Sequence, residues 1–345
     1  MTMVSNPKRR TADIRDFILD SIEAHPTDIS RVTAEHFGIT RQAVLAHIRR
    51  MAAEGLLRIE GTTKDRVYSP RPLRKELVEL RLDIDLSEDI VWRDRLRPLI
   101  ETLPRNLVDI CQYALTEMLN NVIEHSSADL ALITFEEHLR WIRWTIHDDG
   151  VGIFEKIMTD LGLDDIRQAI LELSKGKLTT DPKGHTGEGV FFTSRVFDTY
   201  AILSSDLYFS HDQAGDDWLV QSEASREGTS VFMKIRKDST RTIREVFDKY
   251  SVPGSYAFDR THVPVSLSRY GNENLVSRSQ ARRLLARFER FREVFLNFKG
   301  VETIGQAFAD EIFRVFQEEN PGIKIVYVNA NSSIKRMIWR ARGVQ

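Results

Sequence analysis

The chain has 345 residues, a formal net charge of −2 and 41% hydrophobic residues, which predict two or three globular domains. Its single cysteine, Cys111, excludes an internal disulfide, and no apolar run approaches the roughly 20 residues of a membrane span. Because the basic cluster Lys8-Arg9-Arg10 is not followed by the apolar stretch of a signal peptide, we expect a cytoplasmic protein.

Residues 11–70 predict three helices followed by two short strands. The first helix is indicated by apolar residues at helical spacing, namely Ile14, Phe17, Ile18 and Ile22. Asp28 is placed to cap a second helix that ends near Gly38, and Thr40 to cap a third that begins at Arg41. Residues 56–60 and 64–68 then alternate as two strands around a turn at 61–63.

This order of elements resembles winged helix-turn-helix regulators, most closely over residues 36–50 and the strands that follow. The resemblance implies that the start of the third helix enters the major groove of DNA. The candidate DNA contacts are Thr40, Arg41, Gln42, His47, Lys64 and Arg66. A winged helix used for protein contacts or for homodimer formation is the alternative, and the basic cluster at residues 8–10 favours DNA.

Pro70 and Pro72 separate this module, residues 1–72, from a second segment that runs to residue 237. This segment mixes strands and helices. A strand at 77–86 and a helix at 90–103 precede a strongly apolar helix at 107–126, and strands follow at 130–135 and 140–147.

The apolar helix carries a first polar group of residues, Glu117, Asn121 and His125, spaced four apart and therefore on one helical face. A carboxylate in this position can orient a water molecule beside a phosphate, and an amide oxygen can bind Mg²⁺. A solvated polar stripe on a helix is the alternative interpretation of this group alone.

Two glycine-rich segments follow. Residues 148–153 place Asp149, Gly150 and Gly152 directly after a predicted strand, where a carboxylate can accept the exocyclic amine of adenine. Residues 184–191, with Gly187 and Gly189, open a predicted helix whose free N–H groups favour phosphate. Lys183 adds a candidate cation beside the phosphates, although a solvated loop lysine is the simpler interpretation.

In order and spacing these segments resemble the nucleotide-binding boxes of the gyrase/heat-shock-chaperone/histidine-kinase/MutL (GHKL) ATPases, over residues 73–237. The resemblance implies an α/β sandwich that binds ATP and Mg²⁺. It makes Glu117 the candidate base, Asn121 the Mg²⁺ ligand and Asp149 the residue that reads adenine. Thr229 would support that aspartate, and residues 154–186 would form a mobile lid.

Two features separate the chain from a sensor histidine kinase. No long helical hairpin with a phosphoacceptor histidine precedes the Glu117 box, and His125 within the box is expected to pack or to form hydrogen bonds. One strand and one helix before the box are more similar to the anti-sigma-factor serine kinases.

Residues 238–262 are weakly patterned and are expected to form a linker, and a βαβαβα pattern follows over residues 263–345. The segment 295–310 is similar to the strand, loop and helix of STAS domains. The position that matches the phosphorylated serine of that fold is Gln306, preceded by Gly305, with Thr303 as a weak substitute.

The sequence therefore predicts an α+β multidomain protein made of a winged helix, a GHKL-type domain and a small STAS-like domain. The expected function is an ATP-responsive transcription regulator with slow ATP hydrolysis. The alternatives are an anti-sigma-like protein serine/threonine kinase and a nucleotide-gated switch that only binds proteins, with a partner at the STAS-like domain.

Overall fold

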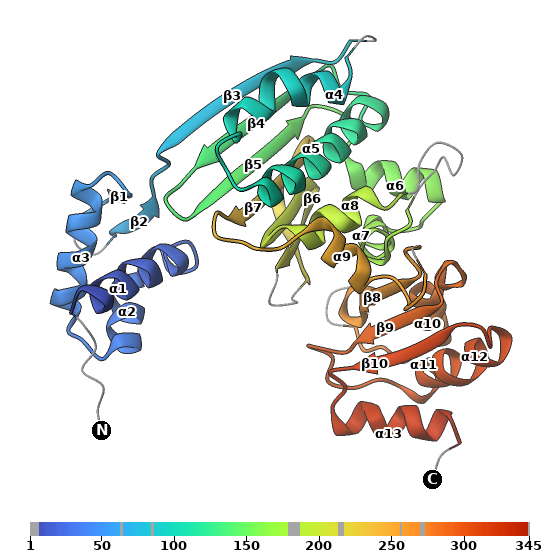
Figure 1. The fold of residues 1–345 in the computed structure, drawn as a ribbon. Helices are drawn as coiled ribbons and strands as arrows, with labels where there is room; N and C mark the ends of the chain where they lie inside the picture. The colour runs from blue at the N-terminus through green and yellow to red at the C-terminus, as the bar shows by residue number, and fades with distance from the viewer. Residues whose placement is uncertain are drawn as a thin grey trace. The chain divides into compact units, whose positions relative to one another are not determined.

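The computed structural model describes residues 7–62, 65–83, 86–178, 187–212, 217–255, 257–269 and 273–343, and the side chains of 7–10 and 217–226 are not described (Figure 1). The fold is a mixture of helices and several sheets, and the chain divides into two compact units. Unit 1 comprises Met1–Leu77, Thr134–Trp144 and Arg236–Asp238. Unit 2 comprises Val78–Ile133, Thr145–Ile235 and Ser239–Gln345.

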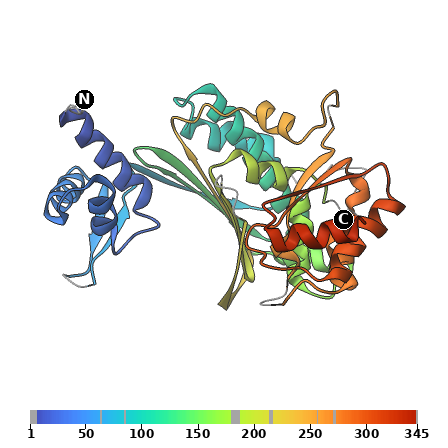
Figure 2. The same cartoon turned by 90° about the horizontal axis from the view of Figure 1, so that it is seen from below.

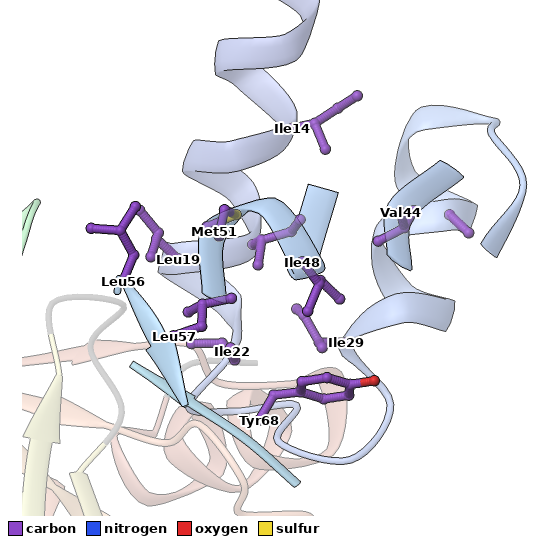
Figure 3. Close-up of a cluster of buried hydrophobic side chains, with 12 residues drawn as sticks. Ile14, Leu19, Ile22, Ile29, Val44, Ile48, Met51, Leu56, Leu57 and Tyr68 are labelled. Atoms are coloured by element: carbon purple, nitrogen blue, oxygen red, sulfur yellow. The ribbon is translucent and has the colours of Figure 1, made fainter. Parts of the chain in front are cut away.

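Unit 1 begins with three helices and a two-stranded antiparallel sheet, as the apolar spacing predicts. The elements are α1 (Pro7–Ser21), α2 (Ile29–Phe37), α3 (Arg41–Ala53), β1 (Leu57–Glu60) and β2 (Val67–Pro70). They share one apolar core, in which Ile18, Ile22 and Ile48 are fully buried and Tyr68 of β2 closes one side (Figure 3).

Capping explains two of the helix boundaries. The Thr40 hydroxyl accepts a hydrogen bond from the N–H of Ala43, which starts α3 as expected. Gly38 ends α2 in the left-handed conformation, with φ of 62°. Asp28 holds the N-cap position of α2, but its carboxylate pairs with Arg31 and His25 and makes no side-chain capping bond.

The second sheet has five strands in the order β3-β4-β5-β7-β6 (Figure 1). The strands are β3 (Arg74–Arg81), β4 (Leu130–Glu137), β5 (Trp141–Asp148), β6 (Thr199–Asp212) and β7 (Asp217–Arg236). The apolar helix α5 (Arg105–His125) buries a stripe that includes Leu115, Met118 and Leu119. The expected helix at 90–103 is instead α4 (Glu88–Val91), a π turn (Trp92–Leu96) and a 3-10 turn (Arg97–Leu99), and Pro98 stands in this last turn.

Further helices follow in unit 2. They are α6 (Ile153–Leu161), α7 (Ile166–Lys175), α8 (Gly189–Val196) and α9 (Ile243–Lys249). Helix α7 and all of α6 except Ile153 lie within residues 154–186, the expected lid. Residues 179–186 of that segment lie outside the part of the chain that the structure describes.

The C-terminal part, coloured orange to red in Figure 1 and Figure 2, is a three-stranded parallel sheet with helices around it. Its strands are β8 (Arg260–Pro264), β9 (Glu293–Asn297) and β10 (Lys324–Val328), in the order β10-β9-β8. Its helices are α10 (Arg278–Leu285), α11 (Gln306–Asp310), α12 (Phe316–Glu319) and α13 (Ser332–Ala341), with a π turn (Glu311–Val315) between α11 and α12 and 3-10 turns at Val265–Ser268 and Phe288–Arg290. The first strand begins three residues before residue 263, where the pattern was expected to start, and it ends at Pro264, which has no N–H to continue the ladder.

The expected linker at 238–262 differs from the structure. Most of it lies in unit 2, where Thr242 and Glu245 form a capping box that starts α9. Tyr250 and Phe258 are buried, and their rings contact Phe191 of α8. Burial of these aromatic side chains turns the segment into a packed part of unit 2. Among the described helices, none has the length and apolarity that a membrane crossing requires.

Candidate functional site

Unit 2 contains a cavity of about 330 Å³, within the usual size range of small-molecule sites. Its walls come from α5, the end of β5, α6, the end of α7, α8 and β7. Apolar side chains form part of the lining, among them Met118, Ile157 and Leu173.

Helix α5 contributes its predicted polar face. Glu117, Asn121 and His125 all line the cavity, together with Asn120 and Ser126. The opposite side of α5 is buried, so the helix cannot rotate without exposing its apolar stripe. The spacing of four that the sequence shows therefore brings these three side chains to one site.

The aspartate that faces the cavity is Asp148, which corrects the expectation for Asp149. Asp149 is not among the described residues that line the cavity, and its carboxylate accepts the N–H groups of Asp129 and Leu130 at 3.0 Å each. Asp148 is 3% exposed, ends β5 and lines the cavity. Asp148 is the last residue of β5 and Asp149 follows the strand, and different backbone groups bind the two carboxylates.

Backbone N–H groups fix the Asp148 carboxylate. Gly150 donates to Oδ1 at 3.0 Å, and the backbone N–H of Thr229 donates to the same side chain. Burial raises the pKa of Asp148, while these two hydrogen bonds and His147 oppose the rise. The Thr229 hydroxyl accepts the N–H of Ile153 at 3.0 Å, which ties β7 to the start of α6.

At two of the predicted glycines, Gly150 and Gly152, a side chain would clash with neighbouring atoms. Gly152 lines the cavity with φ of 85°, and a Cβ there would lie 2.7 Å from Ser204 Oγ. Gly150 does not itself line the cavity; a Cβ on it would meet the Ser126 carbonyl oxygen at 2.2 Å. Gly150 therefore lets the turn after β5 lie against the end of α5.

The third segment also reaches the cavity. Gly187 and Gly189 line it, and a Cβ on Gly189 would lie 2.0 Å from Glu117 Oε2. Glycine at 189 thus allows the first turn of α8 to approach α5. Lys183 and residues 184–186 lie outside the described residues.

The carboxylates of Glu117 and Glu188 interact. Burial raises the pKa of Glu188, Lys177 opposes the rise, and the Glu117 carboxylate adds to it. Negative charge is therefore concentrated where α5 meets the start of α8.

Sequence reasoning missed two polar residues of α6. Lys156 and Asp160 line the cavity, and Lys156 Nζ lies 2.8 Å from Asp160 Oδ2. The lysine and the aspartate are four residues apart, a spacing that by itself indicates only an exposed helix pair.

The residues expected to contact DNA lie on α3 and near the β1–β2 turn. Thr40, Arg41 and Gln42 are exposed at the start of α3, whereas His47 is half-buried. Burial lowers the pKa of His47, and Arg50 lowers it further. Arg66 is half-buried, and Lys64 lies outside the described residues.

Residues 280–335 match the model of the STAS-like domain of unknown function (DUF4325). The C-terminal part of the chain is therefore STAS-like, as the sequence predicts. The match covers β9, β10 and most of the helices around them. No curated protein matches the chain.

Proposed function

We propose that the chain is an ATP-binding transcription regulator whose winged helix, residues 1–72, responds to nucleotide bound in a GHKL-type domain, residues 73–237. The observation that carries the proposal is the cavity itself. Residues from four separated segments line it, in the order that the GHKL boxes have along the chain: Glu117 and Asn121, then Asp148 and Gly152, then Gly187 and Gly189, then Thr229.

Asp148 replaces Asp149 as the residue that reads adenine. Its carboxylate is buried, held by two backbone N–H groups and directed by β5 at the cavity, where it can accept an exocyclic amine. Apolar side chains of α5, α6 and β7 supply surfaces against which a base can pack, among them Met118, Ile153 and Val231.

The polar groups that α5 contributes to the cavity fit a phosphate-bound Mg²⁺ ion. Asn121 would bind the ion through its amide oxygen, an uncharged hard ligand, and the ion would offset the charge of the triphosphate. Glu117 lies one turn away on the same face and would orient the attacking water as the base of slow hydrolysis. The N–H groups at the start of α8 would donate to phosphate oxygens.

Calorimetry with ATP tests the assignment through two neighbouring aspartates. Asp148→Asn converts half of a buried acceptor edge into a donor, and we expect it to weaken ATP binding by about 1 to 3 kcal/mol. Asp149→Asn is the matched control, because its carboxylate contacts the backbone at 129 and 130. Unchanged ATP affinity in Asp148→Asn would remove this residue from the site, and Glu117→Ala should keep binding while losing hydrolysis.

The DNA-binding part of the proposal is supported by the exposed start of α3. Arg41 and Gln42 are exposed in its first turn, next to Thr40, which caps the helix. Side chains at this end of a recognition helix contact base edges in the major groove. We expect Arg41→Ala and Gln42→Ala to weaken binding to specific DNA and to leave ATP affinity unchanged.

Linkage between the two ligands gives the sharper test. If ATP changes the affinity for DNA by some factor, DNA must change the affinity for ATP by the same factor, typically about 5 to 150-fold. Asn121→Ala should remove the effect of Mg²⁺-ATP on DNA binding and preserve the affinity of the nucleotide-free protein. Fluorescence titrations at fixed salt measure both quantities. Equal DNA affinity with and without saturating Mg²⁺-ATP would contradict the regulator function.

The STAS-like match supports a second candidate, an anti-sigma-like protein serine/threonine kinase. Gln306 is the first residue of α11 and cannot accept a phosphoryl group as serine does, so we expect no phosphorylation there. Mass spectrometry after incubation with ATP tests this point. A phosphate on Thr303 or on an added protein partner would favour the kinase. If neither phosphate release nor a phosphoprotein is detected, the result would favour a nucleotide-gated scaffold.

A further inference from the structure

Unit 2 contains a second cavity of about 330 Å³. None of the described residues that line it also lines the first. It lies at the carboxyl ends of the three parallel strands, where Pro264 ends β8, Asn297 ends β9 and Val328 ends β10. Ligands of open α/β sheets bind at this edge. The remaining wall comes from α8, the end of β6 and α9.

Cations are prominent in this wall. Arg195 of α8 is 7% exposed, and its guanidinium lies over the Phe191 ring at 5.0 Å and contacts His211 Nδ1. Lys249, the last residue of α9, is exposed at the mouth. Arg241 also lines the cavity and is paired with Asp198 at 3.0 Å.

Two carboxylates line the same cavity, Asp212 on β6 and Glu245 on α9. Glu245 Oε2 already accepts the N–H of Thr242 at 2.9 Å in the capping box. His262 also lines the cavity. Its ring stacks on Phe295 with centroids 4.4 Å apart.

Cations on three elements lower the pKa of His262. Burial lowers its pKa to about 4, and Lys249 on α9, Arg195 on α8 and Arg260 on β8 add to the decrease. Of these cations Arg195 is buried, Arg260 is half-buried and Lys249 is exposed. The charged form of the imidazole is stabilised when an anion binds beside it.

We propose that this second cavity binds a small anion, a carboxylate or phosphate compound, between Arg195, Lys249 and the His262 imidazole. The site is separate from the nucleotide cavity, but α8 reaches both: Phe191 lines the first and Arg195 the second. The anion is recognised by charge-assisted hydrogen bonds from the two cations. His262 becomes a third donor when it is protonated.

Histidine NMR of the full chain without ATP tests the site. His262 reports the second cavity and His125 the first, so binding to either is distinguished by its own resonance. Orthophosphate and succinate are the two probes, and glycerol is the uncharged control. We expect either anion to raise the pKa of His262 by about 1 or more. The His125 resonance should stay unchanged when succinate is added at the same concentration.

Two variants of α9 make the test specific. Lys249→Gln removes a cation of the wall and should weaken anion binding about tenfold. Arg244→Gln removes an equal charge from the same helix at a residue that does not line the cavity and pairs with Asp248 at 3.8 Å, and should change affinity less than twofold. A His262 resonance unmoved by about 10 mM of either probe, or equal losses in the two variants, would overturn the proposal. A response to phosphate alone would support it and identify the phosphate class.

Discussion

Helix α7 and helix α1 are both held by charged groups, but in opposite environments. Lys175 of α7 has 1% of its side chain exposed; its ammonium donates to Glu172 at 2.6 Å and to the Ala286 carbonyl of the C-terminal domain at 2.8 Å. On α1, Asp16 and Asp20 are 48% and 37% exposed and pair with Arg140 of the β4–β5 hairpin. The first contact is desolvated and directional, whereas the second remains in contact with water and salt.

The α7 contact also affects the first cavity, because part of that cavity is lined by α7 and the residues after it. Leu173 and Leu178 line that cavity, while Lys175 and Lys177 between them bind the C-terminal domain. The Thr261 hydroxyl of β8 also donates to the Lys175 carbonyl at 2.7 Å. The expected mobile lid is therefore fixed at this end by the STAS-like part of the chain.

The largest effect is expected from Lys175→Met, because among the described residues only Arg287 then remains paired with the buried Glu172 carboxylate, 3.5 Å away. Breaking a buried pair from one side costs about 3 to 5 kcal/mol. Hydrogen exchange of peptides from α7 and α10 measures the loss as faster local opening. Lys156→Met is the control, since its pair with Asp160 is solvated.

The double variant Glu172→Leu with Lys175→Met sharpens this prediction. Removing both charges leaves no buried carboxylate that has lost its lysine, so we expect at least about half of the loss in stability to be recovered. Equal exchange rates in the single variant and the wild type would contradict the view that this ion pair holds α7.

A smaller effect is expected on acidification, and it tests both regions. Burial lowers the pKa of His138, in the hairpin, and of His262, in β8, from the ordinary 6.5 to about 4. The folded state then binds fewer protons than the unfolded state, so stability is full above pH 6.5 and is lost as pH falls toward 4. Each histidine accounts for up to about 3 kcal/mol.

Urea unfolding followed by tryptophan fluorescence measures the acid effect, since Trp141 stacks on His138 with centroids 3.5 Å apart. His138→Phe should reduce the pH dependence in this region. If the second cavity binds anions, phosphate should reduce the pH dependence of stability that comes from His262 but not the part that comes from His138. A flat profile between pH 7 and pH 4 would contradict the burial of both rings.

The smallest effect is expected from Arg140→Gln, because partly exposed ion pairs contribute about 1 kcal/mol or less. Faster hydrogen exchange of the hairpin peptide 134–144 at low salt measures it. The difference in exchange rate from wild type should vanish near 1 M NaCl, where the Debye length is only about 3 Å and exposed charges are strongly screened. Arg58→Gln, which removes a pair with Glu60 within β1, is the control. If the faster exchange persists at high salt, the Arg140 contact is desolvated like that of Lys175, which would contradict the comparison.

Local sequence by itself determined the boundaries of several elements and part of the candidate site. Thr40 caps α3 as predicted, and the spacing of Glu117, Asn121 and His125 sets one face of α5, because both depend on contacts within a few residues. The order of the glycine segments predicted which parts of the chain meet at the cavity. The STAS-like C-terminal part was predicted and is confirmed by the family match over 280–335.

Only the tertiary structure decided between Asp148 and Asp149, since both carboxylates follow the same strand and differ only in what faces them. Thr229, about 80 residues away in the chain, donates to Asp148, and the backbone at 129 and 130 donates to Asp149. Residues 238–262 looked like a linker because the partners of Tyr250 and Phe258 are on α8, far away in the sequence. The second cavity exists only where the ends of parallel strands meet α8 and α9. Such long-range contacts leave no periodic signal in the sequence, and they decide which side chains share one site.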